Sequence, residues 1–148
     1  EHKTVPLFYC SAYGNTELLA KAIASGVKEV LPDAEVPLYN VIEHSMEEMG
    51  AVLNESDGFL IGSPTLNKDA LPPIWILLAH ADAVNMAKRP AALFGSYGWS
   101  GEAVGNLADR LKGLKVKLFE KNFRVVFVPT EEDLKQAKEF GKEFAATI

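Results

Sequence analysis

Residues 5–16 read VPLFYCSAYGNT, and this stretch decides the fold of the chain. An apolar run passes directly into a small polar loop, and a helical pattern begins at Glu17. The amides of a first helical turn have no partners within the helix, and the positive end of the helix dipole lies behind them. A strand that leads through such a loop into a helix is therefore typical of a phosphate-binding site.

The loop at residues 11–16 carries groups suited to a phosphate. Hydroxyls of Ser11 and Thr16 and the side-chain amide of Asn15 can complete the site, and Gly14 permits a tight turn. The loop has no lysine or arginine, so dipoles alone would neutralise the anion. It fits neither G-x-x-x-x-G-K-[ST] nor G-x-G-x-x-G, which argues against a nucleoside triphosphatase and a dinucleotide site. The alternative is an ordinary strand-to-helix turn with Asn15 or Thr16 as the N-cap.

Length and composition favour one compact domain over residues 1–148. The chain is 48% apolar and 24% charged, as expected of a soluble globular protein. Its net charge of −5 gives no reason to expect nucleic acid. No apolar run approaches the roughly 20 residues that would cross a bilayer. The chain begins at Glu1 without an initiator methionine, so we expect a processed chain or a domain excised from a longer protein.

The single cysteine and the three histidines give little sign of catalysis or metal binding. Cys10 ends the first apolar run, so we expect a small core residue, and a chain without a possible internal disulfide suits a reducing cytoplasm. His2, His44 and His80 are scattered and form no metal-ligand spacing, so we predict no metal site in this chain.

The remaining pattern alternates strands with helices. We expect strands at residues 5–10, 35–39, 58–61 and 91–94, with two further extended pieces at 116–119 and 123–128. Helices are expected at residues 17–31, 45–55, 72–83, 101–112 and 131–146. Thr130 and Asp133 resemble a capping box at the start of the last helix. The two extended pieces form either one broken edge strand or two strands.

This alternation predicts an α/β fold, a doubly wound, five-stranded parallel sheet of order 2-1-3-4-5 with helices on both faces. Ligands of such folds bind beyond the carboxyl ends of the strands, at the switch point between strands 1 and 3. The functional loops are then expected at residues 11–16, 62–69 and 95–101.

The second and third of these loops favour a flat ligand beside the phosphate. The second, GSPTLNKD, offers hydroxyls and an amide on a backbone stiffened by Pro64. The third, GSYGWSG, places Tyr97 and Trp99 among glycines. A phosphate loop, a polar loop and an aromatic loop together predict a site for flavin mononucleotide (FMN). The alternative is that Tyr97 and Trp99 only cover the ends of flanking helices.

These segments carry a family resemblance over almost the whole chain. SAYGNT, GSPTLNKDALPPIW, GSYGWSGEAV and PTEEDL resemble, in this order, a flavodoxin-like FMN domain. More narrowly, the chain is similar to the C-terminal flavodoxin domain of flavodiiron proteins, also called A-type flavoproteins.

The resemblance implies electron transfer through FMN, with no catalytic side chain. It implies binding by fifteen residues in three groups: at the phosphate, Ser11, Tyr13, Gly14, Asn15 and Thr16; near the ring and ribityl chain, Ser63, Pro64, Thr65, Leu66 and Asn67; on the other side of the flavin, Ser96, Tyr97, Gly98, Trp99 and Gly101. It also implies three kinds of partner: a di-iron domain of the metallo-β-lactamase type in the parent protein, a redox donor such as rubredoxin or a reductase, and a second subunit in a homodimer.

The chain departs from that family in lacking the di-iron domain. The H-x-E-x-D-H ligand pattern has no counterpart here, so reduction of oxygen or nitric oxide cannot belong to this chain alone. Two alternatives remain, a stand-alone flavodoxin and an NAD(P)H-dependent quinone or nitro reductase. The reductases usually carry a histidine in the third loop, and residues 95–101 have none. A receiver domain is disfavoured because no acidic cluster follows the first strand.

Overall fold

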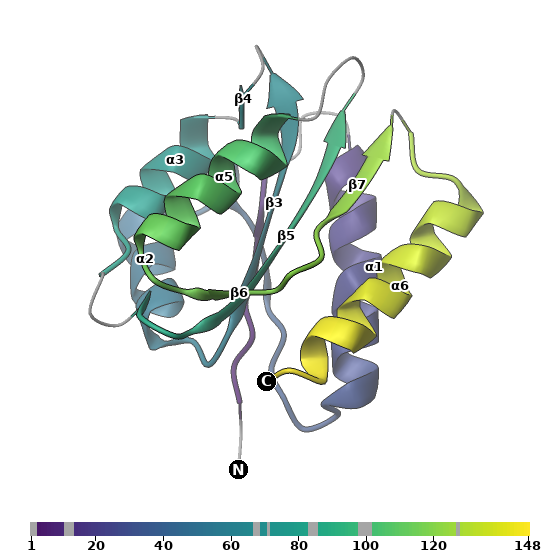
Figure 1. Ribbon diagram of the computed structural model, residues 1–148, viewed down its shortest axis with the longest axis horizontal. Helices are drawn as coiled ribbons and strands as arrows, with labels where there is room; N and C mark the ends of the chain where they lie inside the picture. Colours follow the sequence, from purple (N-terminus) through teal and green to yellow (C-terminus); the bar gives the residue numbers. More distant parts are fainter. Residues whose placement is uncertain are drawn as a thin grey trace.

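The computed structural model describes residues 3–10, 14–66, 69–70, 72–82, 86–97, 102–126 and 128–148. Its elements lie around one twisted sheet with helices on both faces (Figure 1). In chain order they are β1 (Leu7–Tyr9), α1 (Asn15–Val30), β2 (Leu38–Asn40), the short 3-10 helix η1 (Val41–Glu43), α2 (Met46–Glu55), β3 (Phe59–Leu66), β4 (Asp69–Ala70), α3 (Pro72–Ala79), β5 (Pro90–Tyr97), α5 (Glu102–Gly113), β6 (Lys117–Leu118), β7 (Phe123–Val126) and α6 (Glu131–Ala145).

The sheet has the predicted order. Strands β2, β1, β3, β5 and β6 follow one another in parallel, and β7 also pairs with β5. Because β6 pairs with Pro90 and Ala91 while β7 pairs with the later residues 94–97, the two pieces occupy one edge position in succession. They are therefore one broken edge strand. The short strand β4 folds back antiparallel on β3.

Alternating side chains divide the core into two parts. Phe8, Ile61 and Leu93 point to the face covered by α2, α3 and α5. Leu7 and Leu60 point to the other face, under α1 and α6. All five side chains are buried, as expected where helices cover both faces of a parallel sheet.

Helices α1 and α6 approach each other at backbone distance. A Cβ atom on Gly26 would overlap the carbonyl oxygen of Lys138, and one on Gly141 would overlap the carbonyl oxygen of Ile23. Glu29 spans the same contact, with its carboxylate 3.0 Å from the Lys138 ammonium. The absence of a side chain at Gly26 and Gly141 is thus what allows these two helices to pack so closely.

Several predicted boundaries were wrong. Strands β3 and β5 continue to Leu66 and Tyr97, so residues 62–66 and 95–97 are strand where loops were expected. The reason is long-range pairing: the β3–β5 ladder extends to Pro64 and Ser96, and β7 supports β5 beyond it. Helix α3 ends at Ala79, four residues early, where the His80 amide donates to the Leu77 carbonyl in a tightened last turn.

The N-caps of α1 and α6 test two predictions about where these helices begin. The N-cap of α1 is Gly14, so the alternative with Asn15 or Thr16 as the cap was wrong. The capping box of α6 is confirmed, because Thr130 accepts from the Asp133 amide and Asp133 accepts from the Thr130 amide.

Candidate functional site

Those predicted site residues that the structure describes lie at the carboxyl edge of the sheet. In Figure 1 the arrowheads of β3, β5 and β7 end along this edge, and α1 begins there. Register places Tyr9 beside Gly62, Ser63 beside Gly95 and Pro64 beside Ser96. The middle and third predicted segments therefore lie on adjacent strands, next to the strand that leads into the predicted phosphate loop.

Part of the predicted set can be placed. Gly14, Asn15 and Thr16 form the start of α1, and the others that can be placed lie at the ends of β3 and β5: Ser63, Pro64, Thr65, Leu66, Ser96 and Tyr97. The rest lie outside the described residues: Ser11, Tyr13, Asn67, Gly98, Trp99 and Gly101. Among these residues, the structure gives the space around Gly14 and the burial of Thr16 and Ser63.

Gly14 gives α1 an open N-terminus. Its φ of 84° lies in the left-handed region, where a residue with a Cβ is strained, and a Cβ built there would have nothing within 4 Å. The Leu18 amide donates to the Gly14 carbonyl at 3.0 Å and so closes the first helical turn. No side chain of the cap residue covers this end of the helix.

Two buried hydroxyl residues lie at the same edge. Thr16 at the second helical position is 1% exposed, and Ser63 on β3 is fully buried. Burial of a hydroxyl is costly unless it has a hydrogen-bond partner, and both residues have interaction partners in the protein.

Two glycines shape the sheet beside them. A Cβ on Gly62 would overlap the Phe94 ring, and one on Gly95 would come within 2.7 Å of the Ser63 carbonyl oxygen and 3.1 Å of Val104. The sequence pattern placed both glycines in loops. Their role is to let Phe94 and α5 pack closely on the sheet below the site.

One contact near the site was missed by sequence reasoning. The Tyr9 hydroxyl donates to Glu17 Oε1 at 3.0 Å, joining the end of β1 to the first turn of α1. Burial, reinforced by the hydrogen bond to Glu17, raises the pKa of Tyr9 to about 12. Glu17 Oε2 also lies 3.4 Å from the Lys21 ammonium. Tyr9 and Glu17 are eight residues apart, and no local pattern joins them.

The cysteine lies where the prediction of a core residue places it. Cys10 is buried, and burial raises the pKa of its thiol, as expected of a core residue rather than a nucleophile. His44 lies edge-on to the Tyr39 ring. Within the described ranges, no group of three or more His, Cys, Asp and Glu side chains could hold a metal ion.

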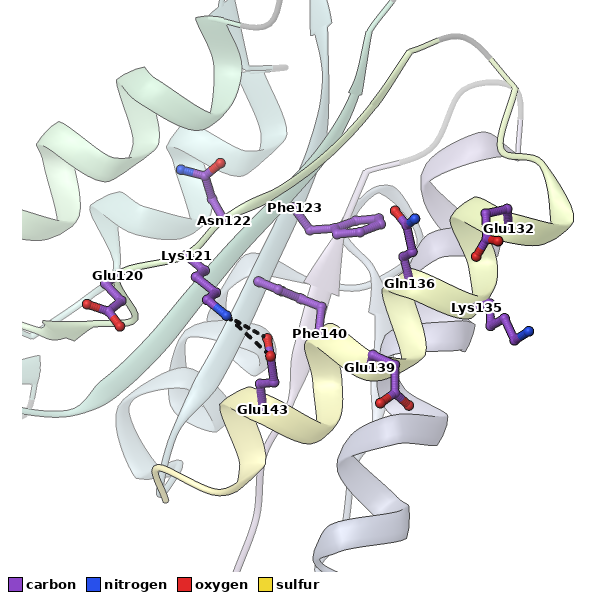
Figure 2. A pocket seen from close by; sticks show the side chains of 10 residues that line it. All are labelled: Glu120, Lys121, Asn122, Phe123, Glu132, Lys135, Gln136, Glu139, Phe140 and Glu143. Carbon is purple, nitrogen blue, oxygen red and sulfur yellow. Dashed lines mark hydrogen bonds and ion pairs between the residues drawn. The ribbon is translucent and has the colours of Figure 1, made fainter.

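A separate groove of about 740 Å³ lies between α6 and the segment that interrupts the edge strand. Figure 2 shows Phe123 and Phe140 at its base and the Lys121 ammonium directed at Glu143, at 3.2 Å. The other lining residues are mostly charged: Glu120, Asn122, Glu132, Lys135, Gln136 and Glu139. Of the predicted FMN-binding residues that the structure describes, none lines this groove.

Among the described helices, none is long and apolar enough to span a membrane.

The order of the strands, with α1 beginning at the carboxyl edge of the sheet, is that of a flavodoxin-like domain. The sequence profile of the flavodoxin family matches residues 7–141, and the chain belongs to this family. Flavodoxins bind FMN and carry electrons, and this chain is an FMN-binding electron-transfer module of that kind.

Similar proteins show which kind of flavodoxin-like domain this chain is. The chain is 51% identical to flavo-diiron protein FprA2 of Clostridium acetobutylicum, over 99% of this chain and 36% of that protein. It is 41% identical to the type A flavoprotein fprA of Rhodobacter capsulatus, over 97% of this chain and 33% of the relative. The chain therefore spans about a third of the length of these relatives and is homologous to their flavodoxin module.

Solved structures agree with this placement. The flavodiiron core of Flv1 from Synechocystis superposes with a TM-score of 0.89 at 37% identity, over 98% of this chain and 36% of that one. An archaeal flavodoxin superposes with a TM-score of 0.83 at 26% identity, over 97% of both chains. The same fold thus occurs both as a module of a larger protein and as a protein of its own.

Proposed function

We propose that this chain is the electron-transfer module of a longer flavodiiron protein, delivering electrons to a di-iron site on another domain. The observation that carries the proposal is the coverage of FprA2: 99% of this chain aligns at 51% identity, but with only 36% of the relative. The described residues contain no candidate metal cluster, and in this proposal the metal centre that receives the electrons belongs to the other domain.

The start of α1 is the proposed phosphate site. The open space at Gly14, the helix dipole of sixteen-residue α1 and the buried Thr16 suit a terminal phosphate. Ser11, Tyr13 and Asn15 complete this part of the proposal. These residues bind and orient the phosphate by hydrogen bonds and dipoles, without a cationic side chain in the loop.

The ends of β3 and β5 are the proposed support for the ring. The pairing of Pro64 with Ser96 supports a shared cradle formed by the two segments. In this proposal, residues 63–67 contact the ring and ribityl chain, and Ser96, Tyr97, Gly98, Trp99 and Gly101 frame the opposite side. FMN supplies reversible electron uptake when bound, and the protein's part is to position the ring and limit its contact with water.

The partners follow from the same proposal. One solved relative is named rubredoxin oxygen:oxidoreductase, from Desulfovibrio gigas, and superposes with a TM-score of 0.88 at 26% identity. We propose a small redox donor such as rubredoxin or a reductase, oxygen or nitric oxide as the final acceptor in the parent protein, a homodimer of that protein, and a cytoplasmic location.

The test compares two readouts on the purified chain reconstituted with FMN. Flavin released by heating should be FMN, one per chain, and not FAD. Supplied with NAD(P)H and a quinone, the chain should show no steady turnover. After chemical reduction, it should be reoxidised faster when the separately prepared di-iron domain of a relative and its acceptor are added. Turnover with NAD(P)H and quinone would instead favour the reductase alternative.

A further inference from the structure

The helices α1, α2 and α6 each carry an acidic residue at the third helical position. These residues are Glu17, Glu48 and Asp133. A carboxylate at this position can turn back and accept from the N-cap amide, which occupies the end of the helix. Asp133 does so in α6, where its carboxylate accepts from the Thr130 amide at 2.9 Å. The N-terminus of α6 is thereby closed by the chain itself.

Glu17 is held differently at the start of α1. Each of its carboxylate oxygens has a partner away from the helix end: Tyr9 donates to Oε1 at 3.0 Å, and the Lys21 ammonium lies 3.4 Å from Oε2. The Tyr9 bond is partly buried, whereas the Lys21 and Glu17 side chains are 62% and 39% exposed. Tyr9 is therefore the stronger of the two restraints, because an exposed ion pair contributes little.

A carboxylate in the first turn of a phosphate-binding helix is a competing anion. It is attracted to the same dipole and the same amides as the ligand. The Tyr9 hydroxyl is protonated, and therefore a donor, throughout the physiological range, and burial and the hydrogen bond to Glu17 raise its pKa to about 12.

We propose that Tyr9 is a positioning residue that holds Glu17 away from the N-terminus of α1 and so reserves that end of the helix for the phosphate of FMN. The inference rests on the proposed phosphate site at Gly14–Thr16. Tyr9 acts only through Glu17 and makes no contact with the ligand.

The experiment measures the affinity of the apoprotein for FMN and for riboflavin, which has the same ring without the phosphate. Tyr9→Phe should weaken FMN binding roughly three- to tenfold, the size of a charge–dipole interaction at a helix end, and leave riboflavin binding within about twofold. Tyr9→Phe/Glu17→Ala should bind FMN as well as Glu17→Ala does, because the competing carboxylate is gone. Tyr39→Phe is the matched control, since Tyr39 stacks on Phe8 on the other face of the sheet, and should change neither affinity.

Glu17→Asp tests the same idea without altering Tyr9, should Tyr9→Phe fail to fold. The shorter side chain loses the reach to Tyr9 but keeps a charge at the position that Asp133 has in α6, so FMN binding should weaken and riboflavin binding should not. Equal losses for both ligands, or no rescue in the double variant, would overturn the proposal.

Thr16→Val tests the proposed phosphate site separately from the proposed role of Tyr9. If it weakens FMN selectively while Tyr9→Phe and Glu17→Asp do not, the phosphate site stands and the role of Tyr9 is wrong. If none of the three variants distinguishes FMN from riboflavin, the phosphate lies elsewhere and both proposals fail.

Discussion

Helix α1 is open at its beginning and closed along its middle, and glycine is used in both places. At Gly14 an added Cβ would meet nothing within 4 Å, whereas at Gly26 it would overlap the Lys138 carbonyl oxygen. The first glycine leaves room and permits a φ of 84°, and the second removes a side chain so that another backbone can take its place. The same residue type therefore lies in open space at one point and in dense packing at another.

The contrast between Gly14 and Gly26 predicts that stability and FMN binding depend on different parts of α1. Substitutions where α1 meets α6 should change the free energy of unfolding without altering affinity for FMN. Substitutions at the carboxyl edge should do the reverse. The predictions below test that division, beginning with the largest expected effect.

Gly141→Ala should destabilise the apoprotein by about 3 kcal/mol, because the new methyl group would overlap the Ile23 carbonyl and only separation of the two helices relieves it. Urea denaturation measures the loss, and FMN affinity of the folded fraction should not change. Gly105→Ala is the matched control on α5, where a Cβ meets nothing within 4 Å, and it should stabilise by roughly 0.5–1 kcal/mol. A comparable loss in both variants would show that helix packing is not the cause.

Thr16→Val should weaken FMN binding by about 1–3 kcal/mol, because it keeps the shape of a buried residue but removes a donor to a charged oxygen. Titration of the apoprotein with FMN gives the affinity, and urea denaturation gives the stability. A large change in stability with unchanged affinity would place Thr16 with the packing residues and break the division.

Trp99→Ala should weaken FMN binding by about 1–2 kcal/mol through lost stacking, while apoprotein stability changes less. Trp99 lies outside the described residues, so its position against the ring stays a prediction. Tryptophan fluorescence checks it: emission should be quenched in the holoprotein, and what remains should come from half-buried Trp75 on α3.

In the alkaline range the stability of the protein should depend on Tyr9, whose pKa rises from 10.0 to about 12 in the folded protein. The unfolded chain releases this proton first, so the contribution of Tyr9 to stability is complete below pH 10 and is lost as the pH rises toward 12. Urea denaturation across this alkaline range should show a decline that is shallower in Tyr9→Phe. An identical decline in both proteins would mean that Tyr9 titrates normally.

The sequence predicts the architecture because that information is local and repeated. Apolar runs of strand length alternate with helical spacing, and each loop can be assigned to an edge from the order of the elements. The strand boundaries that were mispredicted depend on pairing with residues distant in the chain. Strand β5 extends to Tyr97 because β3 and β7 flank it, which residues 91–97 alone do not reveal.

The candidate site divides in the same way. Gly14 and Thr16 could be placed near the start of the first helix because a strand, a small polar loop and a helix follow one another. The link from Tyr9 to Glu17, and the packing role of Gly26 and Gly141, arise from the register between elements, and no spacing in the sequence encodes that register.

The broken edge strand has a consequence for how copies of this protein behave at high concentration. A long, flat sheet edge exposes a row of unpaired amides and carbonyls on which another chain can add. Here that edge is divided into the two residues of β6 and the four of β7, and it carries the charged and exposed Lys117, Lys121 and Arg124. Two short pieces with cationic side chains are poorer templates for an incoming strand than one long strand, so the interruption disfavours growth of the sheet at this edge.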